Sequence, residues 1–128
     1  MKVLVDTHAM LWWLAGDERL STPALRLLED PANVRWISIG TLWETTIKMS
    51  AGRLTVSELD VAAIVDVLKE QEFAILPVRV EDLVRLETLP WIHRDPFDRM
   101  LVAQALAEGV AILTADGMIG RYAVETIW

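Results

Sequence analysis

Four acidic residues stand where a predicted strand or helix begins or ends, and together they could hold a metal ion. They are Asp6, Glu44, Asp98 and Asp116. A parallel sheet gathers such positions at one edge, so the four carboxylates are expected to form a cluster. Because close carboxylates repel one another, such a cluster is expected to bind a hard divalent cation through its oxygen atoms.

Two of these acids follow predicted strands. Asp6 closes the apolar run Val3–Val5, and Asp116 closes the run 110–114. In open parallel sheets, ligands bind beyond the carboxyl ends of the strands, where both residues are expected to lie. Each also has a plainer interpretation, since Asp6 could simply cap the next helix and Asp116 could simply form a turn with Gly117. Capping and metal binding can coexist at Asp6.

The other two acids are predicted to lie on helices. Glu44 precedes Lys48 by four residues, which is the spacing of a helical ion pair, so a purely structural role stays open. Asp95 stands before Pro96 and is predicted to cap a helix, with the proline at the first helical position. Asp98 then falls at the third helical position, where the helix dipole alone favours a carboxylate, so a structural role stays open. With Asp95 engaged as a cap, Asp98 is freer to hold an ion, and Asp95 is the second choice for that role.

The elements that must position these acids follow from hydrophobic patterning and from cap residues. Strands are predicted at residues 2–6, 34–37, 73–78, 110–114 and 124–127, and helices at residues 9–15, 23–28, 39–50, 58–71, 81–89 and 96–108. Thr22, Ser38 and Ser57 are the expected N-caps of three of these helices. Alternating strands and helices predict an α/β fold with a central, mostly parallel sheet. No repeat or linker interrupts the pattern, so residues 1–128 are expected to form one domain.

Composition narrows the class of protein. The chain has 128 residues, 53% of them apolar, which is enough for one domain with a real core. It has no cysteine, which excludes disulfides and thiolate metal sites, and no apolar run long enough to span a bilayer. The apolar start is too short for a signal peptide, so the cytoplasm is the expected compartment. The net charge of −7 predicts that nucleic acid is contacted only locally, through a metal and a small basic rim.

Motifs typical of several other enzyme classes are missing. The sequence has no GxGxxG or Walker loop and no GxSxG elbow, which disfavours dinucleotide, P-loop and serine-hydrolase chemistry. The two histidines, His8 and His93, cannot make a zinc site by themselves. His93 is expected in a loop near the substrate, and His8 at the partly buried start of a helix.

Four segments of the chain resemble the PIN-domain proteins of the VapC-like toxin group. They are Val5–Leu14, Ser38–Lys48, His93–Leu101 and Leu113–Asp116, which occur in order and at fitting spacing. The resemblance covers nearly the whole chain, and His93–Leu101 is its most specific part. It implies a PIN-like three-layer α/β/α sandwich. The acidic quartet of that family maps onto Asp6, Glu44, Asp98 and Asp116.

The resemblance also implies a function. It points to a Mg²⁺- or Mn²⁺-dependent ribonuclease that hydrolyses RNA phosphodiester bonds, usually as the toxin of a toxin–antitoxin pair. In this hypothesis Asp6 and Asp98 are the primary metal ligands, and Glu44 and Asp116 act through water or on a second ion. Two alternatives stay open: a catalytically inactive PIN-like module that binds RNA or a protein, and a metal-dependent phosphohydrolase acting on DNA or flap structures.

Several side chains near the acids are candidates to contact the substrate. Lys48, Arg53, Arg94 and Arg99 are expected to hold flanking phosphates. The alternative for each of them is a solvated surface charge or an ion pair. Thr114 offers a hydroxyl that could orient a neighbouring carboxylate or a water molecule.

Two adjacent tryptophans bear on protein partners. On a helix, Trp12 and Trp13 project about 100° apart, so one is expected to be partly exposed, unless both pack beneath a neighbouring helix. Exposed aromatic side chains often mark interfaces. The family resemblance implies two such partners, a second copy in a homodimer and an antitoxin.

Overall fold

A central sheet of five strands organises the molecule. The computed structural model describes residues 1–128, and its strands lie in the order β3-β2-β1-β4-β5. Their bounds are β1 (Lys2–Val5), β2 (Val34–Ser38), β3 (Ala74–Leu76), β4 (Ala111–Leu113) and β5 (Thr126–Ile127). All neighbours are parallel, and Val5 lies opposite Ile37 on β2 and Leu113 on β4. The residues that follow these three positions therefore reach the same edge of the sheet.

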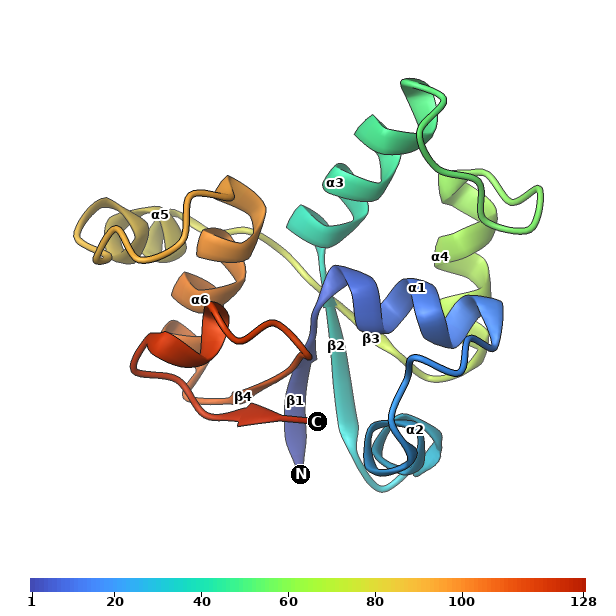
Figure 1. The fold of residues 1–128 in the computed structure, drawn as a ribbon, viewed down its shortest axis with the longest axis horizontal. Helices are drawn as coiled ribbons and strands as arrows, with labels where there is room; N and C mark the ends of the chain where they lie inside the picture. The colour runs from blue at the N-terminus through green and yellow to red at the C-terminus, as the bar shows by residue number, and fades with distance from the viewer.

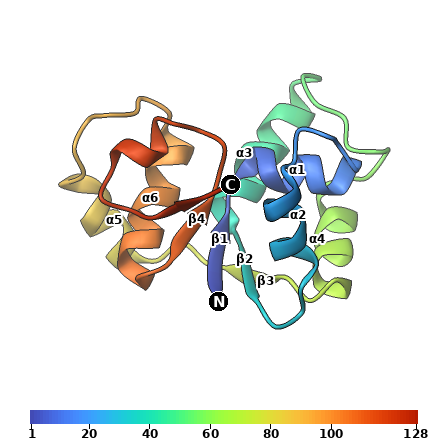
Figure 2. The same ribbon diagram turned by 60° about the horizontal axis from the view of Figure 1, so that its bottom comes forward.

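Helices cover both faces of this sheet (Figure 1), which confirms the predicted three-layer α/β/α sandwich. They are α1 (Thr7–Ala15), α2 (Thr22–Glu29), α3 (Ile39–Ser50), α4 (Val61–Glu70), α5 (Val80–Glu87) and α6 (Pro96–Glu108), with a 3₁₀ turn η1 (Ile119–Arg121). Figure 2 separates the layers, with α1 to α4 on one side of the strands and α5 and α6 on the other. None of the helices has both the length and the apolar character that a membrane-spanning segment needs.

The central strand β1 is buried on both faces, as predicted. Val3 and Val5 belong to the core that also includes side chains of α1, α2 and α4, whereas Leu4 belongs to the core that includes α6. All three side chains are 0% exposed. Because successive side chains of a strand point to opposite faces, one short strand anchors both helical layers.

Cap residues decide where the helices begin. Ser38 caps α3 through its hydroxyl oxygen, as predicted. The other two expected caps are wrong, because Ser21 caps α2 in place of Thr22, and Asp60 caps α4 in place of Ser57. Ser57 has a φ of 44°, outside the extended backbone region that an N-cap adopts. The helix α4 therefore starts at residue 61, and residues 51–60 form an irregular segment.

Both tryptophans of α1 are half-buried, and each packs on an aromatic ring from a distant part of the chain. Trp12 meets Trp128 edge-on with ring centroids 5.7 Å apart, and Trp13 lies 4.9 Å from Phe73. Partial exposure was expected for one of the two tryptophans, and the structure shows it for both.

Candidate active site

Asp6 lies at the end of β1, where its carboxylate is fixed from two sides. Its Oδ1 accepts the N–H of Ala9 at 2.7 Å, which confirms the predicted cap of α1. Its Oδ2 accepts a short hydrogen bond from the Thr114 hydroxyl, at the end of β4. The residue is 3% exposed, and this burial raises the pKa of Asp6, although the bonds from Thr114 and Ala9 oppose the shift. A buried carboxylate of this kind favours a compensating cation.

Thr114 connects Asp6 to Asp116. While its hydroxyl donates to Asp6, its Oγ1 accepts the backbone N–H of Asp116 at 3.0 Å. Asp116 in turn accepts the N–H of Met118 on Oδ1 at 2.8 Å, so the predicted turn is confirmed. Thr114 is only 3% exposed, and its hydroxyl orients these acids, which was one of the roles expected for it.

Asp98 and Asp116 meet at the ring of His93. The Nε2 atom of His93 lies 3.0 Å from Oδ2 of Asp98 and 3.0 Å from Oδ2 of Asp116. Asp95 caps α6 as predicted, because its Oδ1 accepts the N–H groups of Phe97 and Asp98 at 2.8 and 3.3 Å. With Asp95 engaged in this way, Asp98 is the acid of α6 whose carboxylate enters the cluster.

The ring of His93 has a defined orientation. The hydroxyl oxygen of Tyr122 accepts the backbone N–H groups of Ile92 and His93 at 3.2 and 2.8 Å, which fixes the loop. The N–H of Asp95 donates to Nδ1 of the ring at 3.2 Å. Since Nδ1 accepts a hydrogen bond, this pattern assigns the proton to Nε2, which donates to the two carboxylates.

Sequence reasoning placed His93 near the substrate and gave it no part in the acidic cluster. Its position two residues before the cap Asp95 was the available signal. Its contacts with Asp116 and Tyr122 span 23 and 29 residues, and such distances cannot be read from local spacing. The structure also corrects the expectation for His8, whose side chain is exposed at the start of α1.

Glu44 is a buried acid at the edge of the cluster. It is 5% exposed, and its Oε1 accepts the hydroxyl of Thr7 at 2.7 Å. Its Oε2 lies 2.8 Å from Nζ of Lys48, which confirms the predicted helical ion pair. Thr7, which donates to Glu44, is the residue that follows Asp6 in the chain. Glu44 is therefore paired with Lys48 and also lies beside the acidic cluster.

Electrostatic repulsion in the cluster falls mainly on Asp98. Burial, followed by the charge of Asp95, raises the pKa of Asp98 to about 7. Glu44 and Asp116 act in the same direction, and His93 opposes them. A cation beside Asp98 would relieve this repulsion, because an opposite charge favours the ionised carboxyl.

The donor set fits a hard divalent cation. Asp98 and Asp116 each offer one carboxylate oxygen, and these two atoms and a ring nitrogen of His93 all lie within 4.8 Å of one another. Asp6 joins them through Thr114. Carboxylate oxygens are the ligands that Mg²⁺ and Mn²⁺ prefer. The sheet edge thus assembles three of the predicted acids, with Glu44 beside them.

The predicted phosphate-binding residues have different surroundings. Arg99 is 4% exposed, and it donates to the carbonyl oxygens of Pro90 and Leu89 at 2.7 and 3.2 Å. Its guanidinium therefore holds the loop before α6, and the expected phosphate contact is not possible without breaking these bonds. Arg94 and Arg53 are exposed, and they remain accessible to a substrate.

The fold is similar to that of several solved structures. VapBC2 from Rickettsia felis, bound to a DNA fragment from its promoter, has a chain with TM-score 0.75 and 15% identity, covering 99% of this chain and 98% of that one. VapC20 from Mycobacterium tuberculosis is described as a Sarcin-Ricin loop cleaving toxin. It has a TM-score of 0.64 and 19% sequence identity, and the match covers 92% of each chain. FitAcB from Neisseria gonorrhoeae has a TM-score of 0.62 and 16% sequence identity, and the match covers 98% of this chain and 96% of that one.

Sequence comparison gives the family. A search of curated protein sequences finds no match to this chain. The family model described as PIN domain matches residues 3–125, which is nearly the full length and includes all four acids. The chain belongs to the PIN domain family.

Proposed function

We propose that this protein is a divalent-metal-dependent endoribonuclease and the toxin of a toxin–antitoxin pair. The observation that carries the proposal is the convergence of Asp98, Asp116 and His93 within 4.8 Å, next to the buried Asp6. Membership of a family of nucleases supports it, as does the fold shared with a toxin described as cleaving the Sarcin-Ricin loop.

The acidic residues would hold the metal. Asp6 and Asp98 are proposed as the primary ligands of Mg²⁺ or Mn²⁺, with Glu44 and Asp116 acting through water or on a second ion. The chemistry that such an ion supplies when bound is a more acidic water and neutralisation of charge on the scissile phosphate. Thr114 holds Asp6 in place by its hydrogen bond, and the His93 N–H bridges Asp98 and Asp116.

A pair of neighbouring substitutions tests this proposal. Asp98→Asn should abolish Mg²⁺-dependent cleavage of single-stranded RNA, with a loss of at least about 100-fold, because one carboxylate ligand is gone. Asp95→Asn should keep most of the activity, since asparagine also caps helices. Cleavage of labelled RNA, structured RNA and DNA gives the readout. Equal activity of wild type and Asp98→Asn would overturn the assignment, and RNA binding without any cleavage would favour the inactive module.

The proposal includes a homodimer. The apolar stripe of α3 is exposed, with Ile39 at 44% and Trp43 at 62%. Together with Leu83 of α5 and Phe97 of α6, these residues line an apolar groove of about 430 Å³. Large exposed apolar patches mark interfaces, and a second copy of the chain would cover this one. Trp43→Glu should therefore convert a dimer into a monomer in sedimentation experiments, and a monomeric wild type would refute the dimer.

The proposed protein partner is an antitoxin. The fold shared with the chains of VapBC2 and FitAcB supports this assignment. Co-expression with the product of the neighbouring small reading frame, followed by co-purification and a cleavage assay, tests it. Loss of cleavage in the complex is the expected result.

A further inference from the structure

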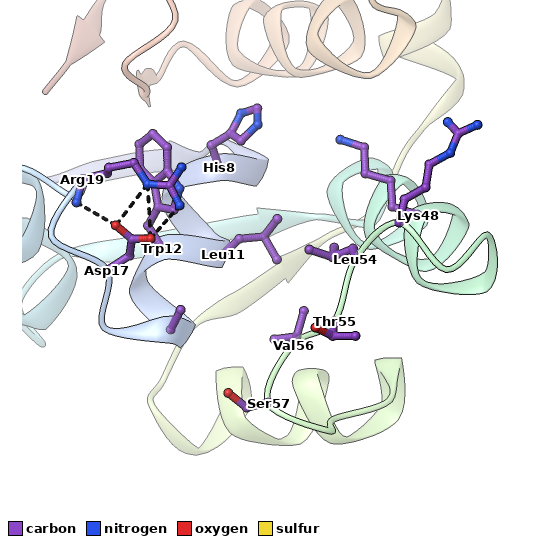
Figure 3. Close-up of a pocket in the computed structure, with 12 residues that line it drawn as sticks. His8, Leu11, Trp12, Asp17, Arg19, Lys48, Leu54, Thr55, Val56 and Ser57 are labelled. Carbon is purple, nitrogen blue, oxygen red and sulfur yellow. Dashed lines mark hydrogen bonds and ion pairs between the residues drawn. The ribbon is translucent and has the colours of Figure 1, made fainter.

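A hollow of about 500 Å³ lies between α1 and the irregular segment after α3 (Figure 3). Leu11 of α1 and Leu54 of the segment point toward each other across it, and Lys48 stands at its rim. Its volume is in the range of binding pockets for small organic groups, about 300–1,000 Å³. The hollow is therefore large enough to take a nucleobase with its ribose.

The hollow adjoins the acidic cluster. Lys48 lines it and also contacts Oε2 of Glu44 at 2.8 Å. His8 lines it as well and lies in the first turn of α1, two residues after the N-cap Asp6. A chain bound at the cluster would thus reach the hollow within one nucleotide or two.

The lining of the hollow includes a cation that no acidic side chain neutralises. Three permanent cations line it, Arg19, Lys48 and Arg53, against the single acid Asp17, in a chain with net charge −7. Arg19 is paired with Asp17 at 2.7 Å, and Lys48 is paired with Glu44 at 2.8 Å. Arg53 is exposed and forms no ion pair. Arg53 is therefore the unpaired cation of the hollow, and on an acidic protein such a local positive charge favours a phosphate-bearing ligand.

The backbone of the segment offers hydrogen-bond donors. None of the N–H groups of residues 54–57 donates a hydrogen bond within the protein. The four residues line the hollow together with Leu11 of α1, and the side chains of Leu54 and Leu11 could sandwich a flat ring. Apolar walls with nearby polar groups are what a nucleobase splayed out of a single strand requires.

We propose that this hollow binds the nucleotide next to the scissile phosphate of a single-stranded RNA. The base lies between Leu11 and Leu54, the N–H groups of residues 54–57 meet its polar edge, and Arg53 and Lys48 hold the flanking phosphate. This inference rests on the proposed ribonuclease function. It adds that the substrate is read as an unpaired strand that passes from the acidic cluster over α1.

Charge reversal at Arg53 tests the inference. Arg53→Glu should raise KM for single-stranded RNA about tenfold and leave kcat nearly unchanged, and Arg53→Lys should restore KM. The dependence of log KM on log salt should lose about one unit of slope, as expected for one lost phosphate contact. Arg26→Glu is the matched control, because Arg26 is exposed on α2 at the other end of the sheet (Figure 1) and the change in net charge is the same.

Three outcomes separate the hypotheses. Equal KM for Arg53→Glu and Arg26→Glu overturns the hollow as a substrate site while leaving the ribonuclease proposal intact. If the wild type cleaves no RNA, fluorescence anisotropy with the same labelled strand decides, since an Arg53-dependent affinity supports the hollow and an Arg53-independent one refutes it. If Arg53→Glu releases a co-purified antitoxin but leaves RNA affinity unchanged, the hollow is a protein-binding site and the inference is wrong.

Discussion

The acidic site has two halves that are held in different ways. In the half formed by Asp6 and Glu44, both oxygens of each carboxylate contact a protein donor, and the residues are 3% and 5% exposed. In the other half, Asp98 contacts only the His93 ring, and the side chains of Asp98 and Asp116 are 20% and 32% exposed. The first half is a fixed scaffold, while the second is open to solvent and carries most of the repulsion. Ions should therefore enter and leave through the second half.

The largest expected effect comes from breaking the fixed half. Thr7→Val removes the hydroxyl that donates to Glu44 and leaves a buried carboxylate oxygen without a partner. We expect a loss of about 2 kcal/mol in the free energy of unfolding, measured by urea denaturation in chelator. Thr22→Val is the matched control, because Thr22 also opens a helix but is exposed. Equal losses in the two variants would mean that Thr7 does not support the scaffold.

A smaller effect is expected from the open half, and it concerns metal affinity. His93→Ala removes the N–H that bridges Asp98 and Asp116, and Mn²⁺ binding measured by calorimetry should weaken about tenfold. His93→Gln should retain most of the affinity, because its amide N–H can reach a similar position. If the alanine variant binds Mn²⁺ as tightly as the wild type, the bridge has no positioning role. Neither variant should lower stability as much as Thr7→Val.

A third test of the comparison is a pH dependence of stability centred on Asp98. Its pKa is raised from 3.8 to about 7, so the folded protein holds this proton more tightly than the unfolded chain does. The resulting stability is present below about pH 4 and is lost as the pH rises through 7. Urea denaturation in chelator between pH 4 and pH 8 should show this loss in the wild type, and it should be smaller in the Asp98→Asn variant, where only the raised pKa of Asp6 remains. The same slope in both proteins would contradict the raised pKa.

Local sequence signals predicted the scaffold well. The strand–helix alternation, the buried strand before Asp6 and the caps Ser38 and Asp95 all depend on residues within a few positions of one another, and the structure confirms them. The ion pair of Glu44 and Lys48 is also a local feature. Its four-residue spacing gave the contact directly.

Contacts between distant segments could not be predicted in this way. The bond from Thr114 to Asp6 joins residues 108 positions apart. Arg99 looked like a surface cation on a helix, yet it is buried against the loop carbonyls and stacks 3.8 Å from the Trp91 ring. The caps of α2 and α4 were misplaced because several cap-forming residues stand close together, and only the backbone geometry selects between them. Spacing alone cannot resolve such choices.

The position of β1 between β2 and β4 has a consequence for synthesis of the protein. The strand β1 can pair with β4 only after the ribosome has passed residue 110. Asp98 and Asp116 are synthesised in the same stretch of the chain as β4. A nascent or prematurely terminated polypeptide that ends before residue 98 lacks two of the four acids, Asp98 and Asp116, and also the strand β4. The complete set of four acids therefore cannot assemble until the ribosome has passed residue 116.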